Sequence, residues 1–266
     1  MISDSERRWG DSMSEAYQRL LAPVVFEPFA VDLVRRVAAT NPKRVLELAA
    51  GTGVVTSGLR SALPDAEIIA TDLNEAMVAF GREHVPQVTW RQADALDLPF
   101  DDDSVDVVVC QFGVMFFPNK RAGYAEMRRV LQPGGSLIMN TWDVVATHEF
   151  AAALSTALDQ VFPADPPTFV AAVPHGYPDP AVVVSDIRSA GFDEVSLETI
   201  TLRSPPASAA DVAVGFCTGT PLRAAIEARA DLASTTEQVA DVMQGLLGTD
   251  PVTARMTAHV IQTTSL

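Results

Sequence analysis

Short apolar runs alternate with longer amphipathic segments between residues 44 and 142. The runs are rich in valine, isoleucine and leucine, and they predict strands at residues 44–48, 67–72, 88–94, 105–112 and 135–142. Three of the intervening segments carry apolar residues at steps of three or four, which predicts helices at residues 53–63, 74–84 and 120–131. Buried strands that alternate with helices are typical of a parallel sheet with helices on both faces.

The pattern is less regular on either side of this stretch. Residues 16–40 favour a helix that is broken near Pro23 and Pro28. After Trp142, we expect helices at residues 148–162, 181–192 and along 208–247, and strands at residues 194–203 and 254–264. The whole pattern predicts an α/β, Rossmann-like fold with a seven-stranded, mostly parallel sheet. We expect the last strand to be antiparallel.

These elements divide the chain into a sheet-forming core and helical additions. Residues 41–144 are expected to form the core, and residues 181–205 and 251–266 to complete its sheet. The additions are an N-terminal helical segment, residues 1–40, and two groups of helices at residues 145–180 and 206–250. We expect the additions to form a cap.

The chain is acidic. Its 266 residues are 48% hydrophobic, which allows a sizeable core, and 19 basic against 34 acidic side chains give a net charge of −15. Such a surface repels phosphate backbones, and no cluster of lysine and arginine offsets it. We therefore expect no nucleic-acid partner.

Other features bear on the compartment. Cys110 and Cys217 lie far apart in the sequence and form no CxxC spacing, which fits a reducing cytoplasm. Residues 1–17 are polar and lack the apolar core of a signal peptide. No run approaches the roughly 18 apolar residues of a membrane span. The sequence thus predicts a soluble, cytoplasmic protein.

The turn after the first predicted strand carries the main functional signal, in the stretch RVLELAAGTGVVTSGL at residues 44–59. Ligands of open parallel sheets bind beyond the carboxyl ends of the strands, and Ala49, Gly51 and Gly53 let the backbone approach a ligand closely. A dinucleotide site would have a third glycine where Thr56 stands, and it would not place an acid such as Glu47 beside a pyrophosphate. The turn therefore favours a cationic ligand over a nicotinamide dinucleotide.

Five motifs in order resemble those of the class I S-adenosylmethionine-dependent methyltransferases, specifically the small-molecule enzymes akin to those of quinone biosynthesis. They are VLELAAGTG, the Asp72–Leu73 pair after the second strand, QADALDLPF, FDDDSVDVVVCQFGVMFFPN and EMRRVLQPGGSLIM. The resemblance covers roughly residues 40–142. It implies S-adenosylmethionine as the cofactor and S-adenosylhomocysteine as the product.

The resemblance assigns residues to the cofactor site, which are Glu47, Ala49, Gly51, Gly53, Asp72, Leu73, Asp94, Ala95, Gln111, Phe112 and Tyr17. It implies that Asp72 accepts hydrogen bonds from both ribose hydroxyls and that Leu73 packs on the adenine. Asp94 would accept from the adenine amino group, and the Ala95 backbone would contact a ring nitrogen.

The resemblance assigns other residues to the methionine end of the cofactor. Gln111 and Phe112 would line it. In relatives an N-terminal aromatic helix closes over the cofactor, which would give Tyr17 a cation–π contact with the sulfonium. Ordinary helix packing is the alternative for Tyr17.

The candidates for acid–base chemistry are histidines, because an imidazole titrates near neutrality. His148 and His175 could each take a proton from an acceptor. Tyr177, two residues after His175 in the tight PHGYP connection, is a further catalytic candidate. A hydrogen-bonded structural role is the alternative for either histidine. No metal site is expected, because the four histidines lack paired spacing and residues 101–103 form a solvated acidic turn.

These observations predict methyl transfer by in-line displacement to a small and apolar molecule. Richness in alanine, valine and phenylalanine at residues 145–180 and 206–250 indicates the apolar pocket. Two alternatives stay open at this point. They are a non-catalytic protein that binds S-adenosylmethionine and, less favoured, an NAD-dependent oxidoreductase on the same kind of fold.

Overall fold

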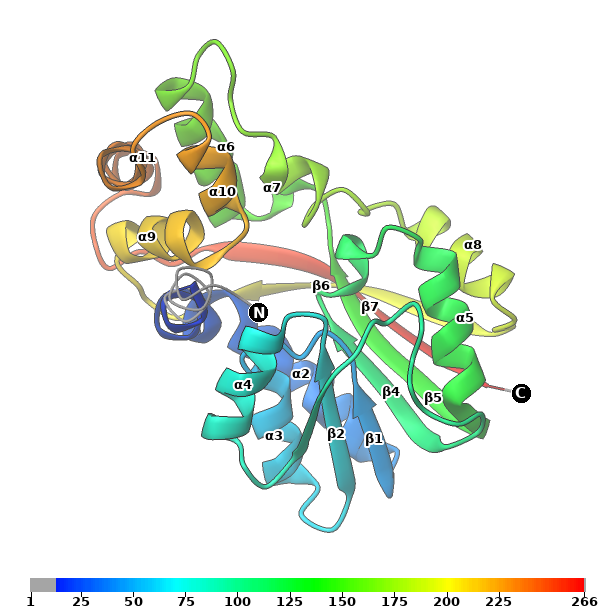
Figure 1. Cartoon of the computed structure of the whole chain (residues 1–266). Coiled ribbons are helices and arrows are strands. Elements are labelled where there is room, and N and C mark those ends of the chain that lie inside the picture. The colour runs from blue at the N-terminus through cyan, green and yellow to red at the C-terminus, as the bar shows by residue number, and fades with distance from the viewer. Residues whose placement is uncertain (1–12, 266) are drawn as a thin grey trace. The chain divides into compact units, whose positions relative to one another are not determined.

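The computed structural model describes residues 13–265 and contains the seven-stranded sheet that the sequence predicts, in the order β3-β2-β1-β4-β5-β7-β6 (Figure 1). The strands are β1 (Arg44–Glu47), β2 (Glu67–Asp72), β3 (Thr89–Gln92), β4 (Val105–Gln111), β5 (Leu131–Trp142), β6 (Val195–Arg203) and β7 (Arg255–Thr264). The pairs within β1 to β5 are parallel, and β7 runs antiparallel to β5. Residues 1–12, assigned above to the N-terminal segment and its polar start, lie outside the described residues.

Helices connect these strands. They are η1 (Tyr17–Phe26), α2 (Glu27–Ala39), α3 (Val54–Ala62), α4 (Glu75–His84), η2 (Val114–Phe116), α5 (Lys120–Val130), η3 (Val145–Thr147), α6 (Glu149–Val161), α7 (Phe169–Ala172), α8 (Pro180–Ser189), α9 (Ala209–Gly219), α10 (Leu222–Glu227) and α11 (Leu232–Leu247). The chain forms two compact units, which we call the sheet unit and the helical unit. The sheet unit comprises residues 29–142, 177–200 and 258–265, and the helical unit residues 13–28, 143–176 and 201–257.

The sheet unit is a three-layer sandwich. One face of the sheet carries α2, α3 and α4, and its core includes Leu33, Val45, Leu59, Val109 and Ile138. The helices α5 and α8 lie together on the opposite face (Figure 1). Residues 29–39, expected in the N-terminal cap segment, group with this unit because α2 buries Leu33 in the core.

Strand β5 begins earlier than the sequence pattern predicts. Leu131 already pairs with Val105, and the register then shifts before Val107 pairs with Ser136. Gly134 supplies the positive φ of +80° that this irregularity needs. The Pro-Gly-Gly segment is thus part of the strand and not only a turn before it.

The expected break at Pro23 does not occur. Pro23 lies inside η1, a π-helix in which the N–H of Glu27 donates to the carbonyl of Ala22, and α2 begins directly after it. Proline removes one donor from an α-helix and clashes with the preceding turn. The wider hydrogen-bond register of a π-helix accommodates both effects while the chain stays helical.

The helical unit packs α11 against α6 and α9 (Figure 1). Helix α9 also lies against η1, and a Cβ on Gly219 would come within 2.7 Å of the Tyr17 backbone nitrogen. The predicted helical stretch 208–247 contains three helices. The last begins where Asp231 accepts a hydrogen bond from the N–H of Ser234 and so caps α11.

Candidate functional site

The Gly-Thr-Gly turn lies at the carboxyl end of β1, between the ends of β2 and β4. The N–H of Leu48 donates to the carbonyl of Val109 and the N–H of Ala50 to that of Thr71, both at 2.9 Å. Ala49, Gly51 and Gly53 have positive φ angles of 52°, 56° and 96°. Because a Cβ on Gly51 would have no atom within 4 Å, the backbone at Gly51 faces open space.

Asp72 ends β2 beside this turn, and backbone groups orient both of its carboxylate oxygens. Oδ2 accepts from the N–H of Gly51 at 2.9 Å, and Oδ1 accepts from the N–H of Asn74 at 2.8 Å. Burial raises the pKa of Asp72, and these backbone hydrogen bonds oppose the rise. A carboxylate has about four acceptor positions, so each oxygen can still accept a hydrogen bond from a ligand.

Glu47 ends β1 and is buried, with 2% of its surface exposed. The hydroxyl of Thr56, on α3, donates to its Oε2 at 2.6 Å. Burial raises the pKa of Glu47, the hydrogen bonds from Thr56 oppose the rise, and the Asp72 charge adds to it, with a net value of about 8. Sequence reasoning treated Thr56 only as a missing glycine and missed its contact with Glu47.

Leu73, Asp94 and Ala95 follow β2 and β3 at the same edge of the sheet, because Asp72 is the register partner of Gln92. The side chain of Leu73 is 66% exposed, and its carbonyl accepts from the Gln92 amide at 2.9 Å. Asp94 accepts from the N–H of Leu96 at 2.9 Å, which shapes the turn that presents Ala95. These residues therefore line the edge next to Asp72.

An aromatic cluster occupies the ends of β4 and β5. Phe112, which follows Gln111, has a φ of +51°, and its N–H donates to both the carbonyl and the side-chain oxygen of Asn140. Its ring stacks on Trp142 with centroids 3.6 Å apart, and Phe29 packs edge-on against both rings. Sequence reasoning identified Phe112 but missed Phe29, Asn140 and Trp142.

Tyr17, His148 and His175 belong to the helical unit. Tyr17 stacks on Phe26 with centroids 4.9 Å apart. The Nδ1 of His148 accepts from the N–H of Ala151 at 3.2 Å and so caps α6. The Nδ1 of His175 lies 2.7 Å from the carbonyl of Asp143, so it must carry the proton.

The two imidazoles meet edge to face, with centroids 5.5 Å apart. Burial, together with the neighbouring His175, lowers the pKa of His148 to about 3. Burial also lowers the pKa of His175, while its hydrogen bond to Asp143 opposes the change. Both rings are therefore neutral near pH 7. Because Nδ1 of His175 holds the proton, its Nε2 carries the lone pair.

Tyr177 lies in the sheet unit and is held by α5 and α8. Its hydroxyl donates to Asp186 at 2.8 Å, and the Lys120 ammonium lies 5.0 Å from its ring centroid. Burial raises the pKa of Tyr177, with the hydrogen bond to Asp186 adding to the rise. These contacts hold the Tyr177 side chain between α5 and α8, and its role as a catalytic group stays a prediction.

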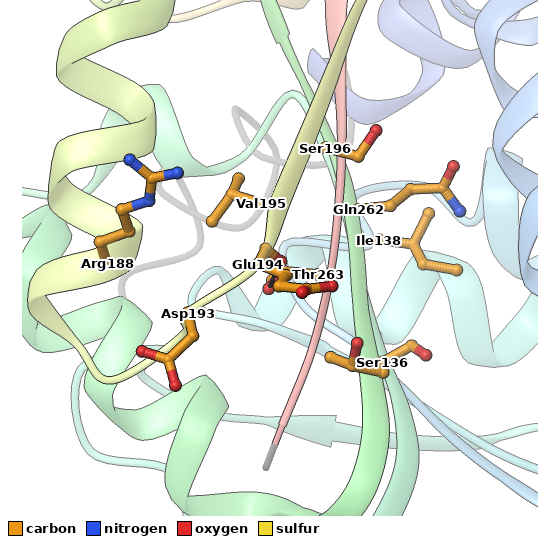
Figure 2. A pocket seen from close by; sticks show the side chains of 10 residues that line it. Ser136, Ile138, Arg188, Asp193, Glu194, Val195, Ser196, Gln262 and Thr263 are labelled. Carbon is orange, nitrogen blue, oxygen red and sulfur yellow. Dashed lines mark hydrogen bonds between the residues drawn. The ribbon is translucent and has the colours of Figure 1, made fainter.

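A pocket of about 580 Å³ lies elsewhere on the sheet unit (Figure 2). Its lining comes from β5, β7, the start of β6 and α8, and includes Ser136, Arg188, Asp193 and Gln262. Ser136 lies in the amino-terminal half of β5, away from the end that Trp142 marks. The pocket is therefore separate from the ligand-binding edge of the parallel strands.

Two kinds of feature are absent from residues 13–265. No three histidine, cysteine, aspartate or glutamate side chains in that range lie where they could hold a metal ion together. In the same part of the chain, no helix has the length and apolar character needed to cross a membrane.

Comparison with known proteins shows which family this chain resembles. A family model for a methyltransferase domain matches residues 45–135. The demethylmenaquinone methyltransferase of Clavibacter sepedonicus is 40% identical over 135 residues, which are 48% of this chain and 54% of that protein. The demethylmenaquinone methyltransferase of Corynebacterium urealyticum is 32% identical over 177 residues, 63% of this chain and 75% of that protein. The chain thus matches about half the length of the first relative and three quarters of the second.

A solved structure shows the same fold. It is an S-adenosylmethionine-dependent methyltransferase from Thermotoga maritima, named as a possible histamine N-methyltransferase. The two chains superpose with a TM-score of 0.57 at 16% identity, over 97% of this chain and 99% of the other.

Proposed function

Because the chain belongs to the class I S-adenosylmethionine-dependent methyltransferases, in a group similar to those of quinone biosynthesis, we propose that it methylates a small, apolar acceptor by in-line displacement. One observation carries the proposal for this chain. Glu47 and Asp72 end neighbouring strands on either side of a turn whose Gly51 backbone is open. Family membership leaves the NAD-dependent oxidoreductase without support.

The two acids have different tasks in this proposal. Asp72, with its oxygens oriented by Gly51 and Asn74, accepts hydrogen bonds from the ribose hydroxyls. Glu47 neutralises the α-ammonium of the methionine moiety. Two acids at this edge suit a ligand that carries an ammonium and a sulfonium, and they repel a pyrophosphate.

The remaining site residues bind the two ends of the cofactor. Leu73 offers an exposed aliphatic surface to the adenine, and Asp94 with Ala95 offers it a carboxylate and a backbone group. Gln111 and Phe112 line the methionine end, where Asn140 fixes the Phe112 backbone. Tyr17 contributes an aromatic face to the cationic sulfonium.

S-adenosylmethionine supplies a methyl group on a good leaving group, so the chain's main tasks are alignment and the exclusion of water. Orientation alone lowers a barrier by about 7–11 kcal/mol in well-aligned reactions. His175 is our candidate for the proton acceptor, because its Nε2 lone pair is fixed by the hydrogen bond from Nδ1 to Asp143. A neutral imidazole at pH 7 can take a proton from a hydroxyl or an acidic carbon.

The acceptor that we propose to test first is a demethylated quinol. The two relatives named above are demethylmenaquinone methyltransferases, and a quinol ring fits the small, apolar acceptor proposed above. The cytoplasm is the compartment we propose, and it suits Cys110 and Cys217, which are both buried free thiols.

The cofactor is tested by calorimetric titration with S-adenosylhomocysteine, with NAD as the control ligand. We expect micromolar binding that Glu47→Ala and Asp72→Ala each weaken at least tenfold, as loss of a charge-assisted hydrogen bond does. Binding of NAD but not of S-adenosylhomocysteine would refute the assignment.

Turnover is tested separately with labelled S-adenosylmethionine and a panel of demethylated quinols, phenols and amines. If His175→Gln slows methylation and leaves cofactor affinity unchanged, the result supports His175 as the general base. Cofactor binding without turnover of any acceptor favours the alternative of a non-catalytic binding protein. Unchanged turnover in His175→Gln removes His175 from the reaction.

A further inference from the structure

We propose that Thr56 is a positioning residue for cofactor recognition, which holds the Glu47 carboxylate in place for the α-ammonium of S-adenosylmethionine. The proposal rests on the function proposed above. Thr56 stands where dinucleotide-binding turns have their third glycine. The same residue therefore disfavours a dinucleotide and supports the binding of S-adenosylmethionine.

The geometry of the pair is the first observation. The hydroxyl of Thr56 donates to Oε2 of Glu47 at 2.6 Å, and the two side chains are 0% and 2% exposed. A short hydrogen bond to a carboxylate is among the stronger ones in proteins, and burial shields this bond from water. It ties one carboxylate oxygen to α3 and thereby fixes the plane of the carboxylate.

The position of Thr56 in its helix is the second observation. Thr56 is the third residue of α3, whose first turn has no side-chain cap at Gly53. The backbone N–H of Thr56 also interacts with Glu47. Glu47 thus places its carboxyl group at the helix amino terminus, where the dipole and the first N–H groups favour its charged form. In a dinucleotide fold a phosphate takes that place.

The electrostatic setting explains why Glu47 needs this support. Asp72 on β2 and the Cys110 thiol on β4 are the titratable groups that interact with Glu47. The Asp72 charge and burial both disfavour a charged Glu47, whereas an α-ammonium requires one. The hydroxyl of Thr56 favours the charged form. Its removal should therefore weaken binding of the amino-acid moiety and leave binding of the adenosine moiety unchanged.

The experiment compares two ligands on one set of variants. S-adenosylhomocysteine carries the α-ammonium, while 5′-methylthioadenosine has the same adenosine and thioether but no amino-acid moiety. Thr56→Val removes the hydroxyl at similar volume, Thr56→Ala repeats the removal without a branch, and Thr56→Ser tests rescue. Thr263→Val is the matched control, because Thr263 is another buried threonine, whose hydroxyl donates to the carbonyl of Glu194 far from this edge.

We expect Thr56→Val to weaken the binding of S-adenosylhomocysteine about tenfold or more. The affinity for 5′-methylthioadenosine should stay within about twofold of the wild-type value. Thr56→Ser should recover most of the loss, and Thr263→Val should bind both ligands as the wild type does. The affinity of the wild type for S-adenosylhomocysteine should rise with pH up to about 8, where Glu47 ionises, and Thr56→Val should shift that rise to higher pH.

Four results would overturn the proposal. An equal loss for both ligands would show that Thr56 only shapes the turn, and so would an unchanged pH profile in both hydroxyl-free variants. Unchanged binding of S-adenosylhomocysteine in these variants would show that the hydroxyl has no role. A wild-type protein that binds neither ligand would refute the proposed function itself, and this inference with it.

Discussion

The rings of Phe112 and Trp142 stack where β4 and β5 end, with an angle of 7° between their planes and centroids 3.6 Å apart. The two strands pair from Val105 to Gln111, so the stack continues the sheet beyond its last backbone pairing. Stacked aromatic rings gain about 0.5–1.5 kcal/mol beyond their buried area. The pair therefore stabilises this edge of the sheet unit as well as lining it.

Replacing Trp142 with alanine is expected to lower the free energy of unfolding by about 3–5 kcal/mol, the usual cost of truncating a buried aromatic side chain. Trp142 is 4% exposed and touches both Phe29 and Phe112. Urea unfolding measures the loss, and Trp142→Phe should lose less because it keeps a ring. Phe116→Ala is the control, because Phe116 is 46% exposed, and it should change stability little. Equal effects of the two alanine variants would contradict the stack's role.

Gly113 is expected to tolerate no side chain. A Cβ there would lie 2.6 Å from the Cβ of Ala49 and 2.7 Å from the Sγ of Cys110. Gly113→Ala should therefore displace the Gly-Thr-Gly turn and lower both stability and affinity for S-adenosylhomocysteine. Overpacking of this kind costs about 1–3 kcal/mol.

Gly245→Ala is the control for Gly113→Ala. Gly245 lies in α11, and a Cβ there would meet nothing within 4 Å. Alanine should stabilise the helix by about 0.5–1 kcal/mol and leave cofactor affinity unchanged. Thermal melts and calorimetry of the two variants measure both effects, and a stable Gly113→Ala protein with normal affinity would show that the turn adapts.

Periodicity was sufficient to predict the fold. Every strand of the sheet lies within a few residues of its predicted range, because a short apolar run or an alternation of apolar and polar residues marks each one. The exception is the start of β5, where Leu131 pairs before a register shift that the Pro-Gly-Gly sequence hides. Local pattern also missed the π-helical register around Pro23, since the sequence signal of a proline is a break.

The cofactor residues could be named from motifs, but their partners could not. The side-chain oxygen of Asn140 accepts a hydrogen bond from the N–H of Phe112, 28 residues earlier in the chain. His175 is oriented by the backbone carbonyl of Asp143, and a backbone carbonyl has no sequence signature. Tyr177, two residues after His175, suggested a catalytic pair. In the structure its hydroxyl is committed to Asp186. Contacts made through tertiary packing are the part that a single sequence does not encode locally.

Glu47 should make the ligand-free protein less stable as the pH rises. Its pKa is about 8 when folded, against an ordinary value of 4.5, so the folded state holds a proton that the unfolded state has lost between these values. Stability is therefore lost as the pH rises from 4.5 to 8, and the raised pKa of Asp72 acts in the same direction. Urea unfolding at about pH 6.5, 7.2 and 8 should show the fall, and Glu47→Gln should reduce it. A Glu47→Gln protein with the wild-type slope would contradict the burial of the charge.

His148 should act in the opposite direction at lower pH. Its pKa is about 3 when folded, against an ordinary value of 6.5, so the unfolded state binds the extra proton between these values. Stability is then lost as the pH falls from 6.5 toward 3. His148→Asn keeps an N-cap for α6 and removes the titration. Its unfolding free energy should depend less on pH between about 6.5 and 5 than that of the wild type, and an equal dependence would place the titration elsewhere.

Cofactor binding should release a proton from Glu47. Below pH 8 the free protein holds Glu47 neutral, whereas the bound α-ammonium requires its carboxylate. At about pH 6.5 we expect release of about one proton for each S-adenosylhomocysteine bound. Calorimetry in buffers of different ionisation enthalpy gives this number as the slope of the observed enthalpy. Glu47→Gln should bind more weakly and release almost none, while 5′-methylthioadenosine should release none even from the wild type. Proton release that persists in Glu47→Gln would assign the titration to Asp72, and the ammonium would then have a different partner.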